Sequence, residues 1–165
     1  MANEQHGMEL SGILIETECA SPGMMVRDVF LECGRAKVHA LPYRDEKGRL
    51  CGRVTLKNIM KLACLPEYMV ELAPLLGQRL SCVEHAEDKV RQILCETVDD
   101  YVLELSETIA SDAPLIRALA TMEKNDTSYI FVVDDGVYRG IVTIQGIAAR
   151  MSEYAVCGVG DKGDR

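Results

Sequence analysis

The sequence predicts an α/β (α+β) fold in which one β-α-β-β-α unit occurs twice, as a pseudo-two-fold pair with a helical insertion between the copies. Two observations carry this prediction. Residues 39–63 and 128–151 read alike, with Gly52 and Gly140 separated by 88 residues and Thr55 and Thr143 at the same spacing. In both segments the spacing of the apolar residues changes along the chain, from the spacing typical of a strand to the spacing typical of a helix. A repeat of this length indicates two copies of one supersecondary unit.

Each of the two similar segments is expected to begin with a β-hairpin. Apolar strands over 40–43 and 129–133 lead into polar turns that end in Gly48 and Gly136. Glycine supplies the positive φ angle that tight hairpin turns require. Second strands follow over 50–55 and 137–143. Helical spacing then begins, with apolar residues at Ile59 and at Ile147, so a helix should follow each hairpin directly.

A helix and a leading strand are expected upstream of each hairpin. In the second copy Ser111 or Asp112 is the predicted N-cap, and Pro114 is expected in the first turn of a helix that runs to about residue 122. The counterpart follows Ser21 and has its apolar residues over 24–30. Leading strands are expected over 13–17 and 101–105.

The domain division follows from these elements. We expect an N-terminal tail over 1–11, a first motif over 12–64, a helical segment over 65–98, a second motif over 99–153 and a frayed tail over 154–165. Within the helical segment, residues 66–72 and 87–94 have helical apolar spacing. The tail from residue 158 consists of small and charged residues, which is typical of a frayed end.

Charge and composition exclude several functions. The chain has 165 residues and a formal net charge of −8, which argues against binding nucleic acid or an anionic membrane surface. No apolar run reaches the roughly 18 to 20 residues that a membrane span needs, so a cytoplasmic protein is expected. The seven cysteines include no C-x-x-C pair, and Cys82-x-x-His85 with Cys95 lacks a second ligand pair, so no metal site is expected.

The repeated segments resemble two CBS motifs (named for cystathionine β-synthase) in tandem, the arrangement called a Bateman module. The residues that carry the resemblance run from Leu41 to Ile59 and from Val132 to Ile147. The resemblance implies a regulatory module that binds an adenosine-type ligand in a cleft between the motifs: AMP, ADP, ATP, S-adenosylmethionine or an NAD-type molecule. It implies no required cofactor and no enzyme activity. Consistent with this, the sequence contains no nucleophile elbow, phosphate-binding loop or zinc-protease motif.

The family's ligand motif, Gly-apolar-x-Thr/Ser-x-x-Asp/Asn, is approximated in the first copy by Gly52, Thr55 and Asn58, with Arg53 in the apolar position. A threonine hydroxyl at a helix N-terminus can bind a phosphate, and an asparagine one turn later can bind ribose hydroxyls. In the second copy Gly140 and Thr143 match, but Gly146 stands where Asp or Asn is expected. We therefore expect at most one good nucleoside site.

Other pocket residues follow from their positions in the resemblance. The adenine is expected near the ends of the leading strands and along the neighbouring strands. Basic residues near the first junction are candidates for a phosphate, although Lys57 is expected to face solvent. The set is Cys19, Ala20, Lys37, Val38, His39, Ala40, Pro42, Arg53 and Lys57 in the first copy, and Ile109, Ala110, Thr127, Ser128 and Tyr129 in the second.

Structural interpretations of the same residues remain open. Thr55 and Thr143 can serve only as helix caps, and Asn58 can be solvated without a ligand. His39 can be a partly buried strand side chain, and Pro42 can mark a strand start. Two functions therefore remain. The chain is either a stand-alone ligand sensor that signals to a partner protein, or a dimerisation and interaction module with a degenerate pocket.

Self-association is expected under both hypotheses. The resemblance implies a dimer formed through a helical surface, which gives a disc of two modules. The apolar positions expected near this contact are Ile59, Leu62, Ile147 and Met151. The same residues can instead form an intramolecular core.

Overall fold

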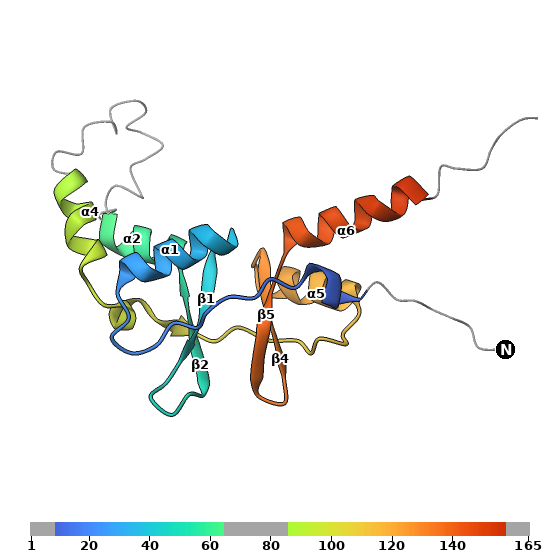
Figure 1. Ribbon diagram of the computed structural model, residues 1–165, viewed down its shortest axis with the longest axis horizontal. Coiled ribbons are helices and arrows are strands. Elements are labelled where there is room, and N and C mark those ends of the chain that lie inside the picture. The colour runs from blue at the N-terminus through green and yellow to red at the C-terminus, as the bar shows by residue number, and fades with distance from the viewer. Residues whose placement is uncertain (1–8, 65–85, 158–165) are drawn as a thin grey trace, which may run out of the picture. The chain divides into compact units, whose positions relative to one another are not determined.

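The computed structural model describes residues 9–64 and 86–157. Helices and short antiparallel strands alternate along the chain (Figure 1). The α-helices are α1 (Val26–Ala36), α2 (Leu56–Cys64), α4 (Ala86–Leu94), α5 (Leu115–Lys124) and α6 (Ile144–Cys157). The strands are β1 (Ala40–Arg44), β2 (Leu50–Thr55), β3 (Leu103–Glu104), β4 (Tyr129–Asp134) and β5 (Val137–Thr143). Two 3₁₀-helices, η1 (Leu10–Ile13) and η3 (Val98–Tyr101), complete the described elements.

The chain divides into two compact units. Glu18–Leu105 form the first-hairpin unit, which contains β1 and β2. Met1–Thr17 and Ser106–Arg165 together form the second-hairpin unit, which contains β4 and β5. The second-hairpin unit therefore combines the N-terminal segment with the second sequence repeat.

The first-hairpin unit is built on a three-stranded antiparallel sheet in the order β1-β2-β3. Ala40 pairs with Thr55 at one end of the β1–β2 hairpin, and Arg53 pairs with Leu103 of β3. Helix α4 contacts both α1 and α2. The buried core includes Val26, Val29, Leu41, Val54 and Ile59.

The second-hairpin unit repeats this plan with a shorter sheet. β4 and β5 form an antiparallel hairpin whose turn contains Asp135 and Gly136, both at positive φ. A single antiparallel bridge, Ile15 to Ile141, takes the place of a third strand. The core cluster draws residues from the N-terminal segment, α5, the hairpin and α6: Leu10, Ile109, Ala113, Leu115, Ala118, Met122, Ile130, Val132, Val142 and Ile147.

The leading segments of the two repeats are therefore exchanged between the hairpins. Residues 10–15 pack with the second hairpin, and residues 98–104 pack with the first. The glycine of each hairpin makes room for this crossing. A Cβ atom added to Gly52 would lie 2.8 Å from the Leu103 carbonyl oxygen, and one added to Gly140 would lie 2.6 Å from the Ile15 carbonyl oxygen. Both distances are too short for any side chain.

Several expectations from the sequence are confirmed and others are wrong. Both hairpins, the helices that follow them and the helix near residues 87–94 are present. The leading strand expected over 13–17 is reduced to a bridge at Ile15. The helix expected to be capped by Ser111 or Asp112 begins instead at Leu115, because Pro114 is its extended N-cap residue. α6 continues past residue 153 to Cys157. The helix over 66–72 and the tail from 158 lie outside the described residues.

Candidate functional site

The two strand-to-helix junctions have the same backbone geometry. Strand β2 ends at Thr55 and α2 begins at the next residue, and β5 ends at Thr143 before α6 in the same way. The Thr55 hydroxyl oxygen accepts the Asn58 N–H at 3.1 Å, and the Thr143 hydroxyl oxygen accepts the Gly146 N–H at 3.1 Å. Each threonine is thus a helix cap. Because the oxygen accepts this bond, the hydroxyl proton remains a donor.

The Asn58 side chain is held in one orientation by the backbone of η3. Its Nδ2 donates to the Tyr101 carbonyl oxygen at 3.1 Å. Tyr101 is itself buried, and its hydroxyl donates to Glu96 Oε2 at 2.5 Å. The half-buried Asn58 amide therefore keeps its Oδ1 oxygen as an acceptor and a second Nδ2 hydrogen as a donor. An aspartate here would lose the bond to Tyr101, because a carboxylate cannot donate.

The equivalent position in the second-hairpin unit has no side chain. A Cβ atom added to Gly146 would lie 3.5 Å from Thr143 Oγ1 and 3.6 Å from Ile13 Cβ, which are ordinary contacts. The Ile13 carbonyl oxygen, 3.7 Å away, corresponds to the Tyr101 carbonyl. The space for a polar side chain is present, but the sequence supplies none. Only the first-hairpin unit therefore has the pair of a capping threonine and an amide.

Two residues expected to contact an adenine base have their backbone groups hydrogen-bonded to strand residues. Ala20 N–H donates to the Pro42 carbonyl at 2.8 Å, and the Ala20 carbonyl accepts the Arg44 N–H at 2.9 Å. Ile109 makes the equivalent pair of bonds with Phe131 and Val133. The backbone of Ala20 and of Ile109 is therefore satisfied inside each unit.

The structure does not gather the basic candidates in one place. Lys37 and His39 line a groove of about 380 Å³ between α1 and α2, with Leu56 on its α2 side. His39 is exposed rather than partly buried. Arg53 Nε donates to the Glu104 carbonyl at 3.1 Å, so its side chain lies along β3. Lys57 is exposed, as expected.

The other expected site residues differ in exposure. Those on the sheets are mostly buried, and those in the connecting turns are not. Val38, Ala40, Pro42 and Tyr129 are buried, Cys19 and Thr127 are half-buried, and Ala110 and Ser128 are exposed.

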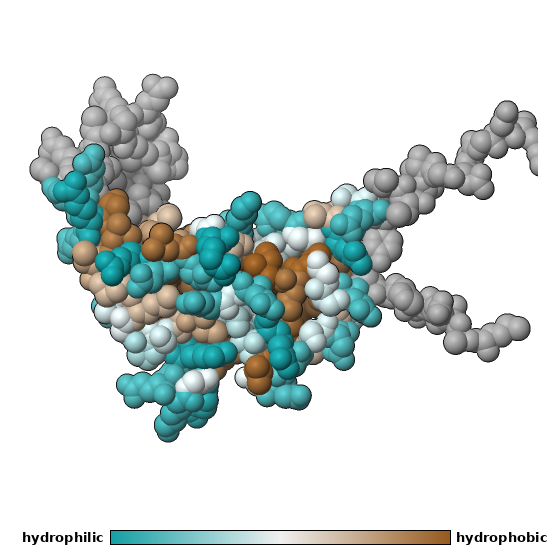
Figure 2. All heavy atoms as spheres, viewed as in Figure 1, coloured by the Kyte–Doolittle hydropathy of each residue, from teal (hydrophilic) through white to brown (hydrophobic). Residues whose placement is uncertain are grey.

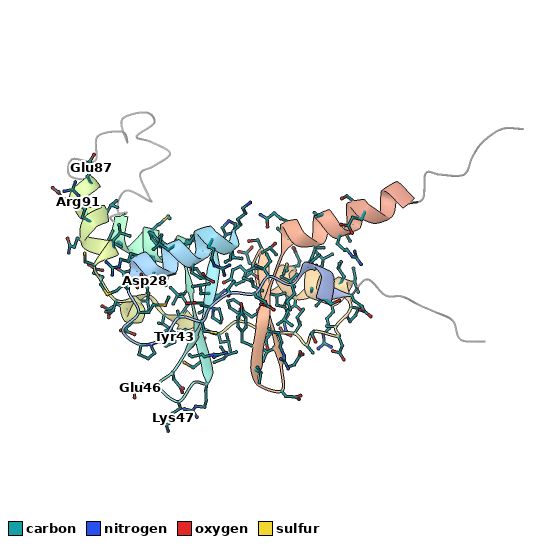
Figure 3. All side chains as sticks on the ribbon, viewed as in Figure 1. Asp28, Tyr43, Glu46, Lys47, Glu87 and Arg91 are labelled. Carbon is teal, nitrogen blue, oxygen red and sulfur yellow. The ribbon has the colours of Figure 1, made fainter. Side chains whose placement is uncertain are left out.

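A second polar cluster of the first-hairpin unit was not found from the sequence. The Tyr43 hydroxyl donates to Asp99 Oδ1 at 3.0 Å, and Gly23 N–H donates to Asp99 Oδ2 at 3.0 Å; Tyr43 is labelled in Figure 3. Burial and the bond to Asp99 raise the pKa of Tyr43 to about 12. Burial opposes ionisation of Asp99, but its hydrogen bonds outweigh this effect and lower its pKa. This cluster ties the loop before α1 to β1 and η3.

Burial keeps two of the cysteines, Cys19 and Cys33, in the thiol form. Burial raises the pKa of the Cys19 thiol, although the nearby Arg44 opposes this effect, and burial raises the pKa of Cys33 to about 12. Among the residues that the structure describes, no three His, Cys, Asp or Glu side chains are placed to hold a metal ion. Cys82 and His85 lie outside those residues. Within the same part of the chain, no helix is long and apolar enough to cross a membrane.

Comparison with known proteins finds similarity in sequence for one part of the chain and similarity in fold for most of it. Residues 98–153 match the family model described as the CBS domain. No curated protein sequence matches the chain. The CBS domain of a membrane protein from Sphaerobacter thermophilus has a similar structure, at 20% identity and a TM-score of 0.61, over 86% of each chain. CBSX2, solved in complex with AMP, matches at 16% identity and a TM-score of 0.62, over 90% of this chain and 99% of that one.

A third solved structure is the CBS domain pair of protein MJ0100, in complex with 5-methylthioadenosine and S-adenosylmethionine. It matches at 20% identity and a TM-score of 0.57, over 90% of this chain and 98% of that one. The fold is therefore that of a pair of CBS motifs. Residues 98–153 are similar in sequence to the CBS domain, and the fold is the one that the resemblance of the sequence repeats implied.

Proposed function

We propose that the chain is a regulatory module that binds an adenosine-type ligand (AMP, ADP, ATP or S-adenosylmethionine) and transmits the binding to a partner protein. The observation that carries the proposal is the fixed amide of Asn58, one helical turn after Thr55. Asn58 Oδ1 accepts a ribose hydroxyl, and the Thr55 hydroxyl donates to the group attached to the ribose. The solved CBS structures that contain AMP or S-adenosylmethionine support this ligand class.

The site is proposed in the first-hairpin unit alone. The second-hairpin unit has the capping Thr143, but Gly146 offers no polar group to a ribose. Binding acts on a partner only if the ligand has different affinities for two conformations of the module. Loss of the Asn58 contact should therefore remove both binding and regulation.

A specific observation favours the alternative function, an interaction module whose pocket is degenerate. In the first turn of α2, Leu56 N–H already donates to the His39 carbonyl and Asn58 N–H to Thr55. Two of the N–H groups that a phosphate would use are thus bonded within the chain. A ligand without a phosphate group, such as S-adenosylmethionine, depends less on these N–H groups than a triphosphate does.

Thermal unfolding against a panel of AMP, ADP, ATP, S-adenosylmethionine, NAD and GTP distinguishes the two functions. A ligand at 100 times its dissociation constant adds about 2.7 kcal/mol of stability. For a chain of this size, each kcal/mol raises Tm by about 2–4 °C. The sensor proposal expects a selective rise for one adenosine compound and none for GTP. No rise with any compound at millimolar concentration would leave only the interaction module.

The variant Asn58→Ala makes the test specific to the site. It should weaken binding by about 2- to 13-fold, because one hydrogen bond with a ribose hydroxyl contributes about 0.5–1.5 kcal/mol. Asn125→Ala is the matched control. Its Nδ2 also donates to a backbone carbonyl, that of Thr121 at 2.7 Å, but in the second-hairpin unit. Binding that survives Asn58→Ala unchanged would contradict the proposed site.

A further inference from the structure

Tyr101 connects the Asn58 junction with the end of helix α4. Its carbonyl oxygen accepts a hydrogen bond from Asn58 Nδ2 at 3.1 Å, and its hydroxyl donates to Glu96 Oε2 at 2.5 Å. The Tyr101 side chain is 7% exposed. A hydrogen bond to a carboxylate is stronger than one between neutral groups. One buried residue thus joins the junction, through its backbone, to Glu96, through its side chain.

The backbone on either side of Tyr101 is anchored to other elements of the first-hairpin unit. Before it, Val98 N–H donates to the Met24 carbonyl oxygen at 2.9 Å. After it, Leu103 pairs with Arg53 of β2. Tyr101 lies at the end of η3, between these two anchors, and a 3₁₀-helix has poorer hydrogen-bond geometry than an α-helix. The direction of the Tyr101 carbonyl therefore depends on where the Tyr101 side chain is held.

The position of Glu96 follows the last turn of α4. Glu96 N–H donates to the Ile93 carbonyl oxygen at 3.0 Å. The Glu96 carbonyl oxygen accepts the Val26 N–H at 2.9 Å, so α4 is attached to the start of α1 at this residue. A rotation of α4 about this attachment would turn the Glu96 carboxylate, and with it the Tyr101 hydroxyl.

Helix α4 is packed loosely against the rest of its unit. Among the side chains of residues 87–94, only Ile93 is buried, and Val90 is 45% exposed. Figure 2 shows hydrophobic side chains at the surface over α2 and α4, among hydrophilic ones. A cavity of about 230 Å³ between these helices is lined by Leu62, Ala63, Lys89, Gln92, Ile93, Glu96 and Tyr101. An element with few buried apolar contacts has a low local stability, so α4 can move without unfolding the core.

One residue of this cavity, Leu62, belongs to the set for which the sequence predicts a dimer contact. Of the other three positions, Ile59 and Ile147 are 0% and 1% exposed, so they belong to the cores of their units instead. Leu62 and Met151 are 59% and 41% exposed. The apolar residues of α2 are therefore divided between two places, with Ile59 in the core and Leu62 at the cavity beside α4.

We propose that Tyr101 and Glu96 are positioning residues, which fix the Asn58 amide and couple it to α4. The position of α4 and the affinity for ligand then depend on each other, because coupling between two sites is reciprocal. The effect on ligand affinity rests on the proposed function, whereas the coupling of Asn58 to α4 exists without a ligand. All of these residues belong to the first-hairpin unit.

Amide NMR spectra of the ligand-free chain test the positioning role. The Asn58 Nδ2 resonances, assigned by their absence from Asn58→Ala, should shift in Tyr101→Phe and in Glu96→Ala, because each variant removes the bond between the two side chains. Glu96→Gln should keep the wild-type resonances, because its Oε1 still accepts the tyrosine hydroxyl. Tyr138→Phe is the matched control, since the Tyr138 hydroxyl bonds to Thr17 Oγ1 at 2.7 Å in the second-hairpin unit, and it should change nothing at Asn58.

Circular dichroism checks that each variant is folded. Glu96 is half-buried, so Glu96→Ala keeps the test valid if Tyr101→Phe does not fold. Wild-type Asn58 resonances in the folded variants would mean that the backbone anchors alone fix the Tyr101 carbonyl, and would overturn the proposal.

Hydrogen exchange of the ligand-free chain tests the link from Asn58 to α4. Asn58→Ala removes the donor to the Tyr101 carbonyl, so the amides of Cys95 and Glu96 should exchange faster by about 2- to 13-fold, the factor that corresponds to one hydrogen bond. Asn125→Ala removes a comparable bond from the second-hairpin unit and should leave both amides unchanged. Unchanged exchange at both amides in Asn58→Ala would overturn the coupling.

A double-mutant cycle with a bound ligand tests whether Tyr101 acts through Asn58. For any compound of the panel that binds the wild-type chain, Tyr101→Phe should weaken binding, but by no more than Asn58→Ala does. The chain with both changes should bind as weakly as Asn58→Ala alone, because Tyr101 cannot orient an absent amide. Additive losses would overturn the role of Tyr101. If no compound binds, the proposed function fails, and the two ligand-free measurements decide the positioning role by themselves.

Discussion

Replacing Gly52 by alanine tests the close packing of β3 on β2, which also positions the Tyr101 carbonyl beside Asn58. The added Cβ would lie 2.7 Å from Val102 Cγ1 and 2.8 Å from the Leu103 carbonyl oxygen. The valine methyl can rotate away, but the carbonyl belongs to the backbone. β3 must therefore move away from β2, which weakens the strand pairing that it makes there.

The magnitude follows from these two effects. Overpacking costs about 1–3 kcal/mol, and the loss of one ladder hydrogen bond costs about 1 kcal/mol. The free energy of unfolding should therefore fall by about 2–4 kcal/mol, which lowers Tm by about 4–16 °C at 2–4 °C per kcal/mol. Hydrogen exchange at residues 103 and 104 should become faster in the same variant.

Gly34→Ala is the matched control for Gly52→Ala. No heavy atom lies within 4 Å of the Cβ position at Gly34, and alanine is preferred to glycine in a helix by about 0.5–1 kcal/mol. Its Tm should rise slightly. A Gly52→Ala chain with wild-type Tm and wild-type exchange at residues 103 and 104 would refute the steric argument.

Three further predictions follow from the junctions and from α1. Gly146→Ala should stabilise the chain by about 0.5–1 kcal/mol in thermal unfolding, because the added Cβ makes ordinary contacts and α6 loses a glycine. A loss of stability would mean that the space around the added Cβ is too small for a methyl group. Thr143→Val should lower the free energy of unfolding, measured in urea, by about 0.5–2 kcal/mol, because a helix cap is removed. Thr143→Ser should lower it by less, because serine keeps the capping hydroxyl. Equal decreases in the two variants would argue against the cap. The hydrogen bond with Arg35 lowers the pKa of Glu32 in the folded chain. Ionised Glu32 therefore stabilises the fold at pH values above its unfolded pKa of about 4.3. This stabilisation is lost as the pH falls through the lower pKa of the folded state. Glu32→Gln should therefore reduce stability near pH 7 and flatten its loss between about pH 5 and 3, measured by urea unfolding across pH. A profile for Glu32→Gln that is identical to that of the wild-type chain would contradict the role of Glu32.

The helices and strands whose formation is determined by residues close together in the sequence could be predicted. The turns at Gly48 and Gly136 and the change of apolar period gave both hairpins and the helices after them. The exchange of leading segments could not be predicted. Residues 13–17 and 101–105 have similar apolar patterns, so either segment satisfies the edge of either hairpin, and the choice depends on contacts distant in sequence.

The part of the site that side chains form could be predicted from the sequence, whereas the part that the backbone forms could not. Thr55, Asn58 and the missing side chain at Gly146 could be read directly. The acceptor that orients Asn58 is the carbonyl of Tyr101, and a backbone carbonyl has no sequence signature. The helix start at Leu115 was missed for a related reason, since Ser111 donates its N–H to Asp134 across the fold instead of capping α5.

The central claim is that the chain holds one adenosine-type ligand at the Asn58 junction. Isothermal titration calorimetry with AMP and with S-adenosylmethionine tests it most directly, because it reports affinity and stoichiometry together. We predict one ligand per chain for at least one of these compounds, and binding that is weakened by about 2- to 13-fold in Asn58→Ala but not in Asn125→Ala. Two equivalent sites per chain, binding that Asn58→Ala leaves unchanged, or no binding of either compound would contradict it.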